Sequence, residues 1–258
     1  MKTLIIFARA PILGQVKTRL AKCRAVGKKG ALALYRAFLE DAMLMASCTS
    51  AQTIAVHFTP QDAEPMMRAI MHDLLMGFRN ERRFTFVPQA DGGFAQRISH
   101  AFHYEARFGG EDLAMIGADA PMIKPSVVNE ALDFISEHSG MVLGPSGEGG
   151  MYLIGMEAGT PIDFSNVFSE GSELENMILQ ARAGNIPLKM LPETVDVDVE
   201  ADLVSLLGLC HGYEYQRKRE KEIYVLERTI KALAALRLGV ARKGDGATRG
   251  KKIVKIDG

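Results

Sequence analysis

Residues 4–20 read LIIFARAPILGQVKTRL, and this stretch shows how the chain begins to fold. Residues 4–8 form a continuous apolar run, as expected for a strand that helices cover on both faces of a parallel sheet. Pro11 and Gly14 then supply the residue types that favour a turn. The stretch therefore predicts a buried first strand that leads into a loop with cationic side chains.

The same alternation continues along the chain and predicts the fold class. Short apolar runs alternate with amphipathic stretches of helical period, which favours an α/β fold with a doubly wound, mostly parallel sheet between helices. In such a sheet, ligands bind at the carboxyl ends of the strands. The expected strands are residues 3–8, 53–58, 84–87, 113–117, 140–143, 152–155 and 188–191, and the expected helices are residues 31–46, 62–75, 94–107, 125–137, 172–184 and 200–208.

Composition limits the class of protein. The chain has 258 residues, with 31 basic and 31 acidic side chains, so it lacks the basic bias of a dedicated nucleic-acid binder. Its three cysteines form no C-x-x-C pair and are typical of a reducing compartment. The apolar run at residues 4–8 is too short for a signal peptide or a membrane span. We therefore expect a cytoplasmic protein.

The C-terminal part differs in composition, and we expect a domain over residues 1–208 followed by a helix and a basic tail over residues 209–258. Residues 214–238 predict one long charged helix with apolar residues on one face. We expect this helix to pack against the domain or against a second copy in a homodimer. The segment after Gly239 is rich in Lys, Arg and Gly, which favours a solvated tail.

The loop after the first strand contains residues that suit phosphate binding. Lys17 offers a compact ammonium, and Arg19 offers a planar guanidinium that can hold a phosphate through two hydrogen bonds. Gly14 lies three residues before Lys17, so the loop matches neither the P-loop nor the G-x-G-x-x-G spacing. A basic surface loop is the alternative.

Acidic residues follow two later strands. Asp119 stands after the apolar run at residues 113–117 beside small residues, and such a carboxylate can coordinate Mg²⁺ or Mn²⁺ together with substrate phosphates. Asp196 and Asp198 alternate with valines, so in a strand their carboxylates would face one side. Asp198 could then complete a metal site with Asp119 or cap the helix that begins near Glu200, and the two roles are compatible.

Two more segments carry polar groups at strand ends. Glu148 stands among glycines, where a backbone can approach a ligand while the carboxylate contacts hydroxyl or amino groups. A tight hairpin loop is the alternative. Gln89 follows the strand at residues 84–87, where an amide could contact a base edge.

Taken together, these segments resemble a bacterial family of GT-A-fold transferases, labelled glycosyltransferase-like or radical-SAM/selenodomain-associated transferase 1. The resemblance covers about residues 3–207, and its wider relatives include molybdenum-cofactor guanylyltransferase and phospholactate guanylyltransferase. This chain departs from the family pattern at Ala118 and Ala120, where Thr and Cys are usual, and at Glu148, where Asp is usual. The motifs that carry the resemblance are Phe7-Ala8-Arg9-Ala10-Pro11, Lys17-Thr18-Arg19-Leu20, Pro88-Gln89, Gly117-x-Asp119-x-Pro121, Gly144-Pro145-x-x-x-Gly149-Gly150-x-Tyr152 and Asp196-Val197-Asp198-x-x-x-Asp202-Leu203.

The resemblance implies a nucleotide-diphospho-sugar transferase fold and a division of roles among the residues. Lys17, Arg19 and Asp119 would be catalytic, and Asp119 with Asp198 would hold Mg²⁺ or Mn²⁺. The nucleotide would lie against Arg9, Gly14, Lys17, Thr18, Arg19, Gln89 and Arg97, and the acceptor against Glu148, Gly149 and Gly150.

Two functions remain open at this point. The first is a metal-dependent transferase that acts on a nucleoside triphosphate or nucleotide-sugar and moves a nucleotidyl or glycosyl group to a small-molecule acceptor. The second is a non-catalytic protein that binds or senses a nucleotide-sugar. The sequence identifies neither the base nor the acceptor.

Overall fold

The computed structural model describes residues 1–75, 83–219, 226–244 and 250–256. The chain divides into two compact units, and it passes between them several times, so neither unit is one continuous stretch. Unit 1 consists of Met1–Ala10, Ala42–Ala118 and Ile123–Thr194, and unit 2 of Pro11–Asp41, Asp119–Met122 and Val195–Gly258.

Unit 1 is built on a seven-stranded sheet with the order β3-β2-β1-β4-β6-β5-β7. Every neighbouring pair is parallel except the two pairs that contain β6, which runs antiparallel to β4 and to β5. Most strand residues are buried, in agreement with their continuous apolar runs. The strands are β1 (Lys2–Arg9), β2 (Thr53–Thr59), β3 (Phe84–Pro88), β4 (Asp112–Gly117), β5 (Met141–Pro145), β6 (Met151–Glu157) and β7 (Leu188–Met190).

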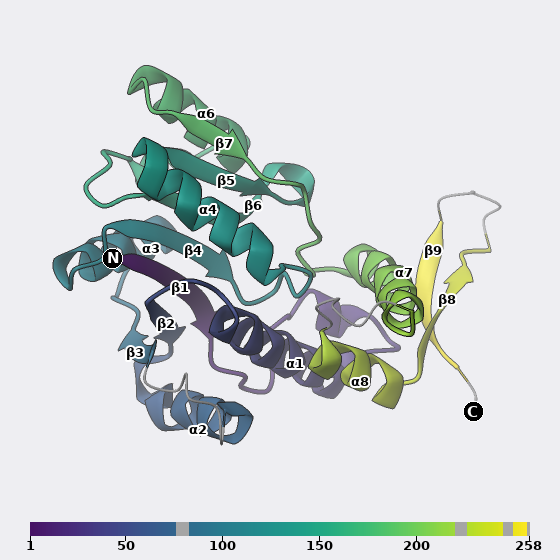
Figure 1. The fold of residues 1–258 in the computed structure, drawn as a ribbon. Coiled ribbons are helices and arrows are strands. Elements are labelled where there is room, and N and C mark those ends of the chain that lie inside the picture. Colours follow the sequence, from purple (N-terminus) through teal and green to yellow (C-terminus); the bar gives the residue numbers. More distant parts are fainter. Residues whose placement is uncertain (76–82, 220–225, 245–249, 257–258) are drawn as a thin grey trace. The chain divides into compact units, whose positions relative to one another are not determined.

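Helices cover both faces of this sheet. On one face, α3 (Phe94–Arg107), α5 (Phe164–Val167) and α6 (Glu173–Ala183) share an apolar core with the strands. On the other face, α4 (Pro125–His138) lies along β4, β6 and β5, and α2 (Glu64–Leu75) contacts β3 (Figure 1). The unit is thus a helix–sheet–helix sandwich.

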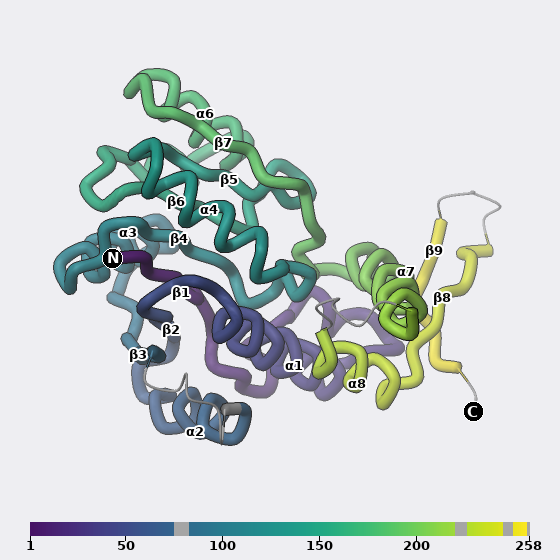
Figure 2. The backbone as a smooth tube through the Cα atoms, viewed as in Figure 1, coloured from purple at the N-terminus to yellow at the C-terminus, as the bar shows by residue number. Residues whose placement is uncertain are grey.

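Unit 2 has a core of its own. Figure 2 follows the backbone from the end of β1 through a loop with a short 3-10 turn, η1 (Leu20–Lys22), into α1 (Gly27–Ser47), whose residues up to Asp41 belong to this unit. The rest is α7 (Glu200–Arg217), α8 (Glu227–Ala235) and an antiparallel hairpin of β8 (Leu238–Arg242) and β9 (Lys251–Lys255). Apolar residues from all these segments pack together, including Leu20, Phe38, Leu206, Leu233 and Ile253.

The predicted fold class is confirmed, since each expected strand and helix over residues 3–208 has a counterpart within a few residues, although α7 continues past residue 208. Two expectations for the C-terminal part are wrong. The long helix over residues 214–238 is not formed, because α7 ends at Arg217 and α8 begins only at Glu227. The segment after Gly239 contains the β8–β9 hairpin instead of a solvated tail. None of the described helices has the length and the hydrophobicity that crossing a bilayer requires.

Candidate functional site: a lysine among three aspartates

The loop after β1 directs Lys17 inward. Gly14 takes a left-handed backbone with φ +79°, and Lys17 takes one with φ 45°, which a residue with a side chain seldom adopts. The Lys17 carbonyl accepts a hydrogen bond from the Ala21 N–H at 2.9 Å, and Val16 and Leu20 are buried on either side. Such a backbone costs of the order of 1–3 kcal/mol and is found mostly at functional sites.

The Lys17 ammonium lies among three carboxylates of the same unit. Its Nζ donates to Asp119 Oδ2 at 2.8 Å and to Asp198 Oδ1 at 2.6 Å, and it lies 3.9 Å from Asp196 Oδ1. The Lys17 side chain is only 4% exposed. Within unit 2, the loop at Lys17, the turn at Asp119 and the segment before α7 therefore meet at one point.

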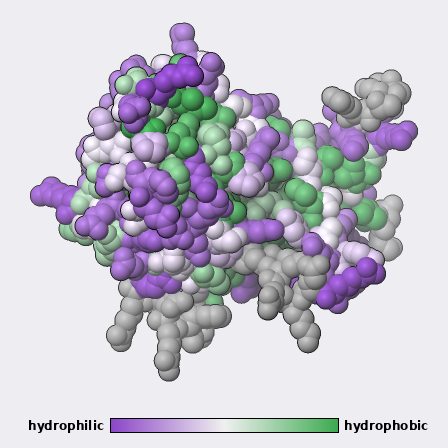
Figure 3. Space-filling model, turned by 45° about the horizontal axis from the view of Figure 1, so that its top comes forward, coloured by the Kyte–Doolittle hydropathy of each residue, from purple (hydrophilic) through white to green (hydrophobic). Residues whose placement is uncertain are grey.

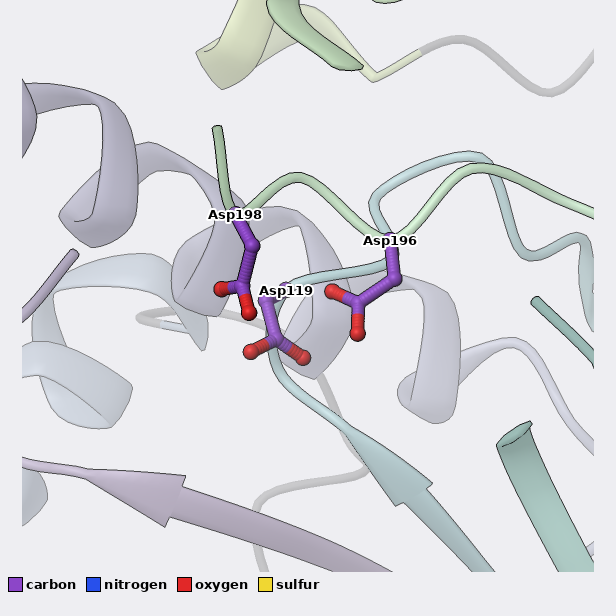
Figure 4. Close-up of side chains that lie close together, drawn as sticks. All are labelled: Asp119, Asp196 and Asp198. Atoms are coloured by element: carbon purple, nitrogen blue, oxygen red, sulfur yellow. The ribbon is translucent and has the colours of Figure 1, made fainter. Parts of the chain in front are cut away.

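Backbone hydrogen bonds hold the two acidic segments together. The Val197 N–H donates to the Asp119 carbonyl at 3.0 Å, which fixes residues 196–198 against the turn after β4. In Figure 4, Asp196 and Asp198 approach Asp119 from two points of one extended segment. This segment is not a strand, yet it still places both carboxylates at Asp119.

Asp202, and not Asp198, caps α7. The Asp202 Oδ2 accepts hydrogen bonds from the Asp198 and Val199 N–H groups, each at 2.8 Å. The Asp198 carboxylate therefore does not cap the helix. It contacts Lys17, while the Asp198 backbone N–H donates to Asp202. An acidic residue at this position is also favourable to the helix dipole.

The pKa values of Lys17 and Asp196 are both raised, for different reasons. Burial alone would lower the pKa of Lys17, but the charges of Asp119, Asp196 and Asp198 outweigh burial and raise it. The pKa of Asp196 is raised to about 7, first by burial and then by the charge of Asp119, and Lys17 only partly offsets this. Lys17 is thus firmly cationic. An additional positive charge beside Asp196 would favour the ionised form of this buried carboxyl group.

The cluster has the donor set of a site for a hard cation. One oxygen from each of Asp119, Asp196 and Asp198 lies within 4.8 Å of the others. The Asp196 Oδ1 is buried and has no hydrogen-bond partner. Three carboxylates and one ammonium leave up to two uncompensated negative charges, and carboxylate oxygens are the ligands that Mg²⁺ and Mn²⁺ prefer. The residues therefore fit a divalent cation.

Asp196 is the member of the aspartate cluster that sequence reasoning left out of the predicted metal site. It was visible as the first aspartate of Asp196-Val197-Asp198, but the expected strand geometry did not show which of the two would reach Asp119. Two other predicted residues, which stand beside Lys17 in the loop after β1, lie nearer the solvent. Arg19 is 71% exposed, with NH1 3.8 Å from Asp198 Oδ2, and Thr18 is exposed beside it.

In unit 1, Gln89 joins the ends of two strands. Its Nε2 donates to the carbonyls of Ala8 at 3.0 Å and His57 at 2.9 Å, and its Oε1 accepts from Arg97 at 2.8 Å. The Arg97 guanidinium also lies 5.9 Å from the centre of the Phe94 ring. The Gln89 amide is therefore already engaged on both sides, and its contact with a base stays a prediction.

The predicted acceptor loop also lies in unit 1. Glu148 is exposed and takes a left-handed backbone with φ 59°, and Gly149 follows with φ 78°. Ser172 Oγ donates to the Gly149 carbonyl at 3.1 Å, and the Ser146 N–H donates to the Gly150 carbonyl at 3.0 Å. The loop is thus held by its backbone and presents the Glu148 carboxylate to solvent.

The structure brings the predicted residues together in two units. Unit 2 contains Gly14, Lys17, Thr18, Arg19, Asp119 and Asp198, and unit 1 contains Arg9, Gln89, Arg97, Glu148, Gly149 and Gly150. The roles assigned to these residues stay predictions.

Comparisons with known proteins agree with this architecture. The chain matches, over 92% of its length and 97% of the other chain, a protein from Desulfovibrio desulfuricans G20 that is provisionally described as a nucleotide-diphospho-sugar transferase, with 24% identity and a TM-score of 0.72. The two chains therefore share one fold. Residues 44–170 match the family described as "Uncharacterized protein conserved in bacteria (DUF2064)". These matches agree with the fold that the resemblance implies.

Two more distant structures share the fold. A cytidylyltransferase from Leptospira borgpetersenii serovar Hardjo-bovis is 12% identical, with 91% of this chain and 94% of that chain covered and a TM-score of 0.51. A 4-diphosphocytidyl-2C-methyl-D-erythritol synthase from Anaerococcus prevotii DSM 20548 is 8% identical, with 81% and 99% covered and a TM-score of 0.50. No curated protein sequence matches this chain.

Proposed function

We propose that this protein is a transferase that acts on a nucleoside triphosphate or a nucleotide-sugar with the help of a divalent cation. The observation that carries the proposal is the cluster of Asp119, Asp196 and Asp198 around Lys17. Phosphate recognition needs positive charge, and this cluster offers both a fixed ammonium and a donor set for Mg²⁺ or Mn²⁺.

The residues of unit 2 have separate tasks in this proposal. Asp119, Asp198 and Asp196 would hold the cation, which supplies positive charge to phosphate oxygens when bound. Lys17 stays protonated, because its pKa is raised by the three carboxylates, so it serves as a cationic hydrogen-bond donor to a phosphate and not as a base. Arg19 is exposed and can hold a second phosphate oxygen pair through its planar guanidinium.

These groups do not determine whether the acceptor attacks a phosphorus atom or a sugar carbon of the substrate. In nucleotidyl transfer, an acceptor oxygen attacks the α-phosphate and pyrophosphate leaves. In glycosyl transfer, the acceptor attacks the sugar carbon and a nucleoside diphosphate leaves. Positive charge near the leaving phosphates favours both reactions. Glu148 and the glycines beside it are proposed to contact the acceptor.

The experiment that tests the proposal separates binding from turnover. A thermal-shift screen of ATP, GTP, CTP, UTP and their sugar diphosphates with Mg²⁺ identifies the preferred nucleotide, because a ligand at 100 times its Kd stabilises the fold by about 2.7 kcal/mol. With that nucleotide, release of pyrophosphate or nucleoside diphosphate is then measured. We expect Asp119→Asn to lower turnover by at least about 100-fold, a range typical of a lost transition-state contact, while nucleotide still binds.

A matched control is Asp62→Asn, which changes an exposed aspartate of unit 1 in the same way. Equal turnover in the Asp119→Asn and Asp62→Asn variants would contradict the proposed role of the cluster. Tight, selective binding of a nucleotide-sugar with no turnover in the native protein would instead identify a sensor.

A further inference from the structure

Unit 2 contains a cavity of about 390 Å³ that the proposed function does not use. It opens between α7, α8 and the β8–β9 hairpin, and its wall contains the apolar side chains of Leu207, Leu233 and Leu238. These three are each about 4% exposed, whereas Ile256 at the mouth is 54% exposed. A space of this size is within the range of small-molecule sites and well above the voids normal in a packed core.

The cavity lies away from the aspartate cluster along the same helix. Glu200 begins α7 two residues after Asp198, whereas the α7 residues at the cavity, from Leu207 to Glu214, lie 7 to 14 residues further on. At a rise of about 1.5 Å per residue, this separation is roughly 10–21 Å. A molecule in the cavity would therefore not occupy the phosphate and cation site.

The polar groups around the cavity are arranged for an anion. Arg237 takes a left-handed backbone with φ 48° and is held there by two hydrogen bonds, from its own N–H to the Ala234 carbonyl at 3.0 Å and from the Ile256 N–H to its carbonyl at 2.9 Å. Among the residues that the structure describes, its guanidinium has no acidic partner. His211 and Glu214 also line the cavity and stand one helical turn apart on α7.

The wider charge distribution favours the same sign. Residues 209–258 contain 13 Lys and Arg against six Asp and Glu, although the whole chain has 31 of each kind. Basic residues such as Arg242, Lys251 and Lys252 are exposed on the hairpin beside the exposed Val240. Figure 3 shows hydrophobic and hydrophilic residues side by side at the surface of this hairpin. An anionic ligand would be attracted to this part of the chain, and a cationic one repelled.

We propose that this cavity is a binding site for a small amphipathic anion, with an apolar body against the leucine wall and a carboxylate or phosphate held by Arg237. The planar guanidinium matches such oxyanions through paired hydrogen bonds. The finite cavity favours a soluble small molecule over a membrane surface, which would need a flat apolar face.

Three eight-carbon probes that differ only in their head group test the proposal: octanoate, octanol and octylammonium. Binding is measured by calorimetry and by thermal shift on the full-length protein. We expect octanoate to bind and to raise the Tm, octanol to bind at least tenfold more weakly, and octylammonium to give no shift.

Two variants and one control sharpen the test. Arg237→Gln keeps a long side chain on the same backbone and should weaken octanoate at least tenfold. Arg242→Gln removes a charge from β8 outside the cavity and should weaken octanoate binding much less than Arg237→Gln, since it changes only the general charge of the hairpin. Ala234→Phe fills the cavity and should abolish binding while the protein still unfolds cooperatively.

Three outcomes would overturn the proposal. Equal affinity for octanoate and octylammonium would mean that the cavity only takes up hydrocarbon. Equal loss in the Arg237→Gln and Arg242→Gln variants would mean that only the general charge matters. Binding to vesicles of phosphatidylglycerol without binding of octanoate would assign the basic hairpin to a membrane surface. Each readout is independent of turnover, so failure here leaves the proposed transferase function untouched.

Discussion

Lys17 combines a strained backbone with a buried charge, and both features are explained by its partners. The left-handed φ of 45° costs free energy, and removing an ammonium from water costs more. The hydrogen bonds to Asp119 and Asp198 offset these costs and aim the side chain at one point. In the absence of a cation, the ammonium is thus the counter-charge of the aspartate cluster.

Replacing this ammonium should make the cluster depend on an added cation. Breaking a fully buried ion pair costs about 3–5 kcal/mol. Because Asp119 and Asp198 are 32% and 49% exposed, we expect Lys17→Met to lower the free energy of unfolding by only about 1–2 kcal/mol. Mn²⁺ should then bind about tenfold more tightly than to the native protein, which corresponds to about 1.4 kcal/mol. Chemical denaturation with and without Mn²⁺ measures both effects.

Arg19→Met is the matched control, since it removes a neighbouring cation that is 71% exposed and only 3.8 Å from Asp198. Its Mn²⁺ affinity should stay close to that of the native protein. If Lys17→Met bound Mn²⁺ no better than Arg19→Met, the ammonium and the metal would not share the carboxylates.

At the scale of single residues, the sequence identified members of the charged cluster better than it predicted their contacts. Lys17, Asp119 and Asp198 were identified from their places after apolar runs and from the family resemblance. The engagement of Gln89 with Ala8 and His57 could not be foreseen, because it depends on which strands are neighbours in the sheet. Asp196 was left out because the sequence did not show that the extended segment at residues 195–198 brings both of its carboxylates to Asp119.

Among the elements, α8 depends on a carboxylate from another helix. Asp41 in α1 accepts hydrogen bonds from the Arg228 N–H at 3.1 Å and the Thr229 N–H at 2.8 Å, the first turn of α8. The residue is 2% exposed, and burial raises its pKa to about 6 even though these hydrogen bonds lower it. The helix therefore begins at a buried acid whose charge is costly near neutral pH.

This arrangement predicts a pH dependence of stability. The pKa of Asp41 is higher in the folded state than its ordinary value of about 3.9, so its contribution is full below pH 4 and is lost as the pH rises through about 6. The free energy of unfolding of the native protein, relative to an Asp41→Asn variant, should therefore fall by about 2–3 kcal/mol between pH 4 and pH 7. Urea denaturation at several pH values measures this difference.

Asp62→Asn serves as the control here as well, because Asp62 is exposed and its replacement should not change the slope with pH. A difference between the native protein and the Asp41→Asn variant that stays constant over this pH range would mean that Asp41 is not the titrating group.

The elements over residues 3–208 could be predicted because each has one dominant signal, a continuous apolar run or a helical period. The C-terminal elements lack such a signal. Apolar residues at helical spacing suggested one helix over residues 214–238, but the described structure contains α7 to Arg217 and α8 from Glu227. The β9 strand is rich in lysine and buries little beyond Ile253, so its composition looked like that of a solvated tail.

For the whole molecule, the core of unit 2 shows that the C-terminal part is structural. Cys210, Leu226, Leu233, Leu238 and Ile253 are all buried in the same apolar cluster as residues of α1. Burying one large apolar side chain contributes about 1.5–3 kcal/mol, whereas a whole domain is stable by only about 5–15 kcal/mol. The division of the chain at residue 208 is a prediction that can be tested on this basis.

A chain that ends at Gly208 should lose the fold of unit 2. Because its core would lack those five residues, we expect rapid proteolysis within residues 11–41 and no measurable binding of Mn²⁺. Limited proteolysis followed by mass spectrometry locates the cuts, and calorimetry measures the metal. A shortened chain that resists protease and binds Mn²⁺ like the full-length protein would show that residues 209–258 are a separate appendage.

The aspartate cluster also has a consequence for the order of events during synthesis. Lys17 precedes Asp119 by 102 residues and Asp198 by 181 residues. At a translation rate of about 5–20 residues per second, roughly 10–40 s pass between the appearance of the lysine and that of its last partner. During that interval β1 and β2 can already pair, while the Lys17 ammonium still lacks Asp198 as a partner. All seven strands of the sheet, up to β7 at Met190, are therefore synthesised before Asp198, so the growing chain can form its sheet before the aspartate cluster is complete.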